Sequence, residues 1–139
     1  MDTNDPANSA LIQVLLQVTE ADATLIDRDD LAAVLAGGNT EATFTNYARK
    51  TLSDAAVTAT AVDDTNNRRT ASIDDWVIAS AGGATNNTLV RLLICYDSDT
   101  TGGTDANIVP LTAHDLTETT NGQQLTVAPT TVQEYFRAS

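Results

Sequence analysis

The sequence is poor in several residue types, and each shortage argues against a class of protein. Its single cysteine, Cys95, rules out an internal disulfide and a cysteine-based metal cluster. No apolar run approaches the roughly 18 residues of a transmembrane helix, and residues 1–5 are acidic where a secretory signal is basic. Seven basic residues against 19 acidic ones give a formal net charge of -12, which opposes binding along a nucleic-acid backbone. We therefore expect neither a membrane nor a nucleic acid as partner.

Threonine and asparagine are abundant instead, at 23 and 10 of 139 residues. With 42% hydrophobic residues the chain can still form a core, and its length corresponds to one domain. Residues 1–9 have little to bury, so we expect a flexible N-terminal arm that acts as a tether or contacts a partner, followed by a single domain over 10–139.

An alternation of apolar and polar side chains, typical of strands, runs through the later part of the chain. The predicted strands are 57–62, 70–73, 76–79, 89–96, 108–113 and 125–127. The first two would form a hairpin across a polar turn, and Asn121-Gly122 predicts a second hairpin turn before the last strand. Pro110 restricts its strand to an edge or a bulge.

Residues 89–96 are apolar on both faces, which predicts a strand at the centre of a sheet. The two expected faces are Val90, Leu92, Ile94 and Tyr96 on one side, and Leu89, Arg91, Leu93 and Cys95 on the other.

The first third is less regular. Residues 11–18 fit a strand, which we favour, although Leu11, Leu15 and Val18 also have helical spacing. A helix is predicted over 29–36, capped by Asp29 and ended by Gly37-Gly38. Residues 41–52 fit either a helix or an extended chain. A helix there would give 31–52 the outline of a helix-turn-helix, which the net charge and the local threonines oppose. The expected fold is an antiparallel β-sandwich with one short helix near residues 29–36.

The candidates for catalysis are weak. His114, the sole histidine, would end a predicted strand beside Asp115, where a carboxylate could orient it as a general base. A single histidine without a second feature is more typical of a surface or turn position. Cys95 lies in the most apolar strand, where a cysteine behaves as a small hydrophobe. We therefore expect no catalytic residue, no enzyme activity and no cofactor.

Residues 97–105 have the spacing of part of a calcium loop. Asp97, Asp99, Gly102 and Asp105 match positions 1, 3, 6 and 9 of an EF-hand loop, but position 12, which should be a glutamate, is Ile108. The flanking segments are also predicted strands rather than helices. Asp97, Asp99 and Asp105 are thus a weak calcium candidate, and a polar loop whose side chains cap its own backbone is favoured.

Two further spots suggest contacts with partners. Arg68 and Arg69 form a small basic spot beside a turn. Tyr135 and Phe136, with Val132, either close the core or pack on a neighbouring subunit.

Several short runs resemble a group of small structural proteins of tailed bacteriophages, encoded among head and tail genes. These runs are NYARKTL (46–52), VDDTN (62–66), DW (75–76), GGATNNT (82–88), YD (96–97) and TTGGTD (100–105). The likeness extends from about residue 41 to the C-terminus. It implies a β-sandwich module of the virion and brings no catalytic residue with it.

The expected function is that of a head decoration (cement) protein, made in the bacterial cytoplasm and bound to the capsid exterior. Its partners would be the major capsid protein and copies of itself, for example as a trimer; repeated weak contacts then sum to avidity. Acidity suits the outside of a particle filled with DNA phosphates. The alternatives are a minor tail or fibre-associated protein and, from another class, a calcium-dependent binding module or small hydrolase.

Overall fold

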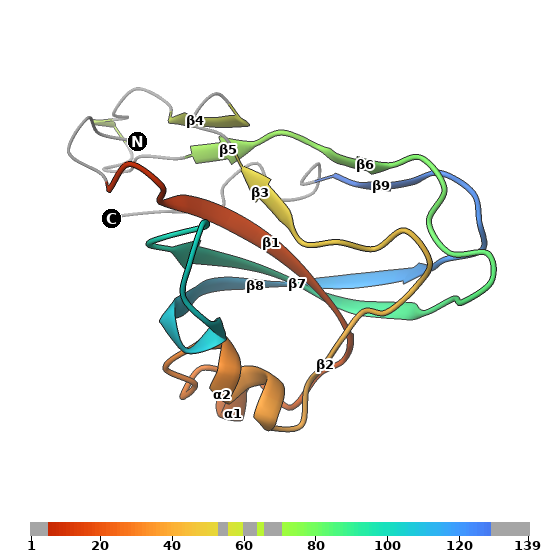
Figure 1. The fold of residues 1–139 in the computed structure, drawn as a ribbon, viewed down its shortest axis with the longest axis horizontal. Coiled ribbons are helices and arrows are strands. Elements are labelled where there is room, and N and C mark those ends of the chain that lie inside the picture. The colour runs from red at the N-terminus through yellow and green to blue at the C-terminus, as the bar shows by residue number, and fades with distance from the viewer. Residues whose placement is uncertain (1–5, 53–55, 60–63, 66–70, 129–139) are drawn as a thin grey trace.

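Two long apolar strands lie side by side at the centre of the main sheet. In the computed structural model, which describes residues 6–52, 56–59, 64–65 and 71–128, β1 (Ala10–Val18) pairs antiparallel with β7 (Thr88–Asp97). β8 (Ile108–Thr119) pairs with the other side of β7. Two short strands, β2 (Thr40–Glu41) and β3 (Lys50–Leu52), share the outer side of β1. β1 and β7 are central because their side chains are apolar on both faces and both faces are covered (Figure 1).

One face of this sheet packs against smaller antiparallel pairs. β4 (Val57–Ala59) pairs with β5 (Ala71–Ile73), and β6 (Trp76–Ile78) pairs with β9 (Leu125–Val127). Figure 1 shows β6 and β9 running along the side of the main sheet that lies opposite the helices. The buried cluster between the layers includes Leu15, Leu92 and Ile94 from the main sheet and Trp76 and Ile78 from β6. The fold is therefore mainly β and sandwich-like, as predicted.

The other face of the main sheet is covered by helices. α1 (Asp22–Leu25) and α2 (Leu31–Ala36) lie below it in Figure 1, beside the 3₁₀ helix η2 (Asp105–Asn107). Leu31 and Val34 of α2 pack on a second buried cluster from β1 and β7 that includes Val14, Leu16 and Leu93. The structure has two short helices rather than the single one expected, because α1 is one turn and too short to give a periodic pattern.

The helix cap differs from the prediction by one residue. Asp30, not Asp29, is the N-cap of α2, and its Oδ1 accepts the backbone N–H of Ala33 at 2.7 Å. Either aspartate could cap a helix, and Asp30 is the cap because the helix starts at Leu31. Gly37 ends the helix as predicted.

The strand predictions are confirmed for 11–18, 76–79, 89–96, 108–113 and 125–127, each to within about two residues except at the end of β8, which continues to Thr119. The hairpin of β4 with β5 is confirmed, although residues 60–63 and 66–70 lie outside the described chain. Residues 41–52 are extended where they are regular, so the second helix of a helix-turn-helix is absent from this stretch.

The turn at Asn121-Gly122 does not make a hairpin. β8 and β9 do not pair; β9 pairs with β6 in the other layer. Gly122 has a φ of 87°, and its N–H and that of Asn121 both donate to the carbonyl of Ala81. The turn is therefore a corner that carries the chain from one layer to the other.

Leu89 faces the opposite way from the prediction. It belongs to the cluster of Leu92 and Ile94, between the layers, and not to that of Leu93 and Cys95. Beside Leu89 the pairing of β7 with β8 is irregular: Leu89 is opposite Glu118 and Arg91 is opposite Asp115, so β8 has one residue more than β7 between these pairs.

Pro110 lies in a strand at the sheet edge and beside a bulge. Ile94 is opposite Thr112 while Cys95 is opposite Pro110, which leaves Leu111 without a partner on β7. Both expectations for this proline are thus met in one place.

Across the described ranges no helix is long and apolar enough to cross a membrane.

Candidate functional site

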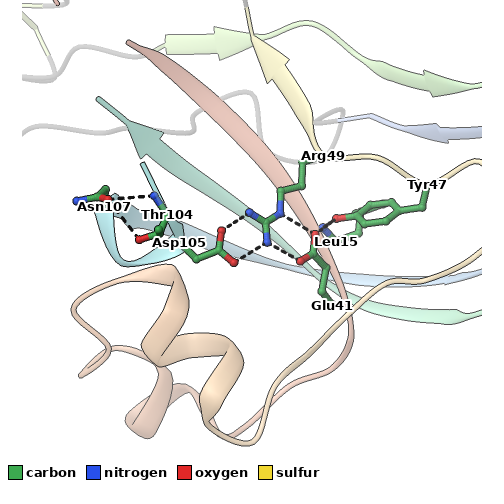
Figure 2. A network of polar contacts seen from close by, with 7 residues as sticks. All are labelled: Leu15, Glu41, Tyr47, Arg49, Thr104, Asp105 and Asn107. Atoms are coloured by element: carbon green, nitrogen blue, oxygen red, sulfur yellow. Dashed lines mark hydrogen bonds and ion pairs between the residues drawn. The ribbon is translucent and has the colours of Figure 1, made fainter. Parts of the chain in front are cut away.

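One densely hydrogen-bonded polar group of the described fold is centred on Arg49, directly before β3. Its guanidinium binds Glu41 of β2 through Nε–Oε1 (2.8 Å) and Nη2–Oε2 (2.7 Å). It also binds Asp105 of η2 through Nη1–Oδ1 (2.6 Å) and Nη2–Oδ2 (3.0 Å). Figure 2 shows the guanidinium lying between the two carboxylates, each held in a two-pronged contact. We call Glu41, Tyr47, Arg49 and Asp105 the arginine clamp.

Tyr47 connects the clamp to the central sheet. Its hydroxyl donates to Glu41 Oε1 at 2.8 Å and accepts the backbone N–H of Leu15 at 3.1 Å (Figure 2). Its ring lies 5.2 Å from that of Phe44 and 6.2 Å from that of Trp76, between centroids. Burial raises the pKa of Tyr47 well above its usual range, so the hydroxyl stays protonated and keeps donating.

The contacts within the clamp stabilise the charged forms of Arg49 and Asp105. Hydrogen bonding to Arg49 lowers the pKa of Asp105, and the two carboxylates raise the pKa of the guanidinium. The side chains of Arg49, Glu41 and Asp105 are 28%, 20% and 35% exposed, so solvent screens the group only in part. Because bidentate arginine–carboxylate pairs fix orientation as well as distance, the clamp joins the β2–β3 connection rigidly to η2.

The structure does not bring Asp97, Asp99 and Asp105 together. Oδ1 of Asp97 accepts the N–H of Asp99, and Oδ1 of Asp99 accepts the N–H and hydroxyl of Thr101. The bonds from Thr101 lower the pKa of Asp99. Asp105 turns away to Arg49, and no group of three metal-binding side chains occurs in the part of the chain that is described. Asp97 and Asp99 therefore cap the backbone of the loop, as the sequence favoured, whereas Asp105 binds Arg49.

The end of the N-terminal arm lies on this loop. The carbonyl of Asn8 accepts the N–H and the hydroxyl of Thr100, and its amide donates to Thr101. Asn8 thus binds this part of the arm to the 97–105 loop, while residues 1–5 lie outside the described residues.

The GGATNNT run forms a second polar hub, centred on Asn87. Its Oδ1 accepts the N–H of Thr43 at 2.6 Å, and its amide donates to Gln17 at 2.7 Å. Its own backbone exchanges bonds with Thr120. Asn87 is 8% exposed, so these bonds satisfy a buried amide and tie three segments together at the corner between the layers.

His114 lies in the middle of β8 rather than at a strand end. Its Nε2 is 3.0 Å from Thr112 Oγ1, and burial and the nearby Arg91 lower its pKa. Asp115, the carboxylate expected to orient it, pairs instead with Arg91 at 3.2 Å. Neighbouring side chains on a strand point to opposite faces, which separates the two.

A pocket of about 330 Å³ lies between α1 and the edge of the main sheet. Leu25 and Ile26 form one wall, and the stretch from Pro110 to Ala113 forms another. Arg91 borders it and is held by Asp22 at 2.7 Å and by Asp115. The sequence did not predict this pocket, because α1 is too short to give a periodic pattern and only Pro110 indicated an irregular edge.

The remaining predicted contacts, Arg68, Arg69, Tyr135 and Phe136, lie outside the described residues. Cys95 is fully buried, and burial raises the pKa of its thiol to about 12, as expected for a structural cysteine. Comparison of the chain with protein-family models, with curated proteins and with solved structures found no match.

Proposed function

We propose that this chain is a structural protein of a tailed-bacteriophage virion, specifically a decoration (cement) protein bound to the outside of the head. The observation that carries the proposal is where the residues of the phage-like runs lie. Tyr47 and Arg49 of NYARKTL and Asp105 of TTGGTD form the arginine clamp, and Asn87 of GGATNNT forms the second hub. These residues of the phage-like runs thus have a common structural role: they hold loops rigidly on a sandwich-like framework.

A rigid framework suits a protein that acts by adhesion. Binding is favoured when the surface is already ordered, since less conformational entropy is lost on contact. The net charge of -12 keeps the free protein soluble and suits a position outside a DNA-filled shell. Many copies on one particle would then add weak contacts into firm attachment, with the major capsid protein and neighbouring copies as partners.

Copy number in purified virions of the encoding phage tests the proposal. Quantitative mass spectrometry should find hundreds of copies per particle, and a reconstruction should place its density on the head surface. A few or tens of copies at the tail would favour the minor tail or fibre-associated alternative. Complete absence from virions would refute both.

The calcium-dependent alternative has its own test. Millimolar calcium should leave the thermal melting temperature unchanged, because Asp105 is engaged by Arg49 and Asp99 by Thr101. A clear rise in the melting temperature with calcium, absent in Asp99→Asn, would support the calcium-binding alternative.

A further inference from the structure

We propose that the outer edge of β8 and the pocket beside it form a docking groove for an extended segment of a partner protein. The segment carries a lysine or arginine two positions before a large apolar residue. This inference rests on the proposed function, since it names the surface through which such a module attaches.

The edge of β8 offers backbone for pairing. β8 is twelve residues long and ends the strand order β2-β1-β7-β8, with no strand on its outer side within the described ranges. Pro110 and two register shifts interrupt this edge, but residues 112–115 between the shifts are regular and can accept an added strand, whose main-chain hydrogen bonds supply affinity. Val109 and Leu111 are 44% and 43% exposed along it, so the edge also offers apolar surface.

The pocket offers a place for one side chain of that strand. The same four residues, from Pro110 to Ala113, are both sheet edge and pocket wall. Across from them Ile26 is 82% exposed, with Leu25 beside it and Leu93 also lining the space. A volume of about 330 Å³ lies at the lower end of the range of ligand sites, enough for one large apolar side chain.

The negative charge beside the pocket favours a basic residue in the bound segment, near the apolar residue that enters the pocket. Asp115 and Asp22 both pair with Arg91, yet their side chains are 86% and 78% exposed. Two carboxylates on one guanidinium leave one negative charge at the rim, since Arg28, which also lines the pocket, is paired with Glu20. Since alternate residues share a face, Asp115 and Ala113 face the same side of β8. In an antiparallel partner, the residue opposite Asp115 stands two positions before the residue opposite Ala113, which places the basic residue before the apolar one.

The same charge disfavours a second copy of this chain as the occupant. Pairing β8 with itself would bring Asp115 and Glu118 of both copies to one edge, between molecules that each carry a net charge of -12. Like charges placed across a strand pair are destabilising. A basic segment of another protein is complementary instead.

Synthetic peptides test the groove on the isolated, full-length protein. The probe is an end-blocked, fluorescein-labelled Thr-Val-Lys-Thr-Phe-Val-Thr, with two controls that carry Glu for Lys or Ala for Phe. By fluorescence anisotropy the probe should bind at least tenfold more tightly than either control. Ala113→Trp, which fills the mouth of the pocket, should weaken binding at least tenfold, and Asp115→Asn should reduce the preference for Lys over Glu. Val77→Trp, at an exposed position of β6, is the matched control and should bind like wild type.

The outcomes separate this inference from the proposed function. Melting curves confirm that each variant is folded before binding is compared. No binding of the probe at millimolar concentration, equal affinity for the Lys and Glu peptides, or unchanged binding in Ala113→Trp would overturn the groove. So would a concentration-dependent dimer that Ala113→Trp abolishes, since a second copy would then be the occupant. None of these results bears on copy number in virions, which tests the proposed function alone.

Discussion

Removing the guanidinium of the arginine clamp should destabilise the protein strongly. Arg49→Met keeps most of the side chain's apolar length but leaves Glu41 and Asp105 facing each other without a cation. Deleting one partner of a fully buried ion pair costs about 3–5 kcal/mol. These side chains are 20–35% exposed, so solvent screens part of the loss, and we expect about 3 kcal/mol. For a chain of 139 residues this lowers the melting temperature by about 10 °C.

Urea unfolding followed by tryptophan fluorescence measures this loss. Trp76 is the sole tryptophan, is buried, and lies near Tyr47 of the clamp, so its emission reports on this part of the core. Lys50→Met is the control. It removes the adjacent charge, whose exposed Nζ donates to the carbonyl of Asp75, and should change stability by about 0.5 kcal/mol or less. If Arg49→Met is no more destabilising than this control, the clamp does not hold the fold as argued.

Three smaller changes probe the helix, the response to acid and one loop. Asp30→Ala should lower the unfolding free energy by about 1 kcal/mol through loss of the cap, and Asp29→Ala should not, by thermal melting. The pKa of Glu20 is lowered from 4.5 to about 2, chiefly by its hydrogen bond from an arginine, so its stabilising effect is complete above pH 4.5 and is lost as the pH falls toward 2. Glu20→Gln should therefore flatten the stability profile in that window, and an unchanged profile would contradict the assignment. Gly82→Ala should cost about 2 kcal/mol, because Gly82 has a φ of 91°, whereas Gly102→Ala, at ordinary φ, should cost clearly less.

Local sequence patterns predicted the elements whose structure depends mainly on their own residues. β1 and β7 have dense runs of apolar residues that can be buried only with both faces covered, and this placed β7 at the centre of a sheet. Pro110 lacks a backbone N–H, so its position at an edge and bulge follows from its own chemistry. The turn-forming loop at 97–105 is another example, since Asp97 and Asp99 bond to backbone only two residues away.

Features that depend on distant partners were not predictable in the same way. The Asn-Gly turn has the residues of a hairpin, yet β9 pairs with β6, which is nearly fifty residues earlier in the sequence. The register shift between Leu89 and Arg91 belongs to the pairing with β8, and the local alternation of residues 89–96 does not indicate it. Arg49 and Asp105 are 56 residues apart in the sequence, and the residues around each give no sign that the two side chains are paired.

The depth of Cys95 gives the molecule a built-in reporter. Its thiol lies in the cluster beneath α2, with no exposed surface and a pKa of about 12, so ordinary thiol reagents should reach it only when the helices lift from the sheet. The rate at which a disulfide reagent modifies the native protein then measures that opening directly. A cysteine introduced on the surface would meanwhile accept a fluorophore or a heavy atom selectively, with no need to replace the native one.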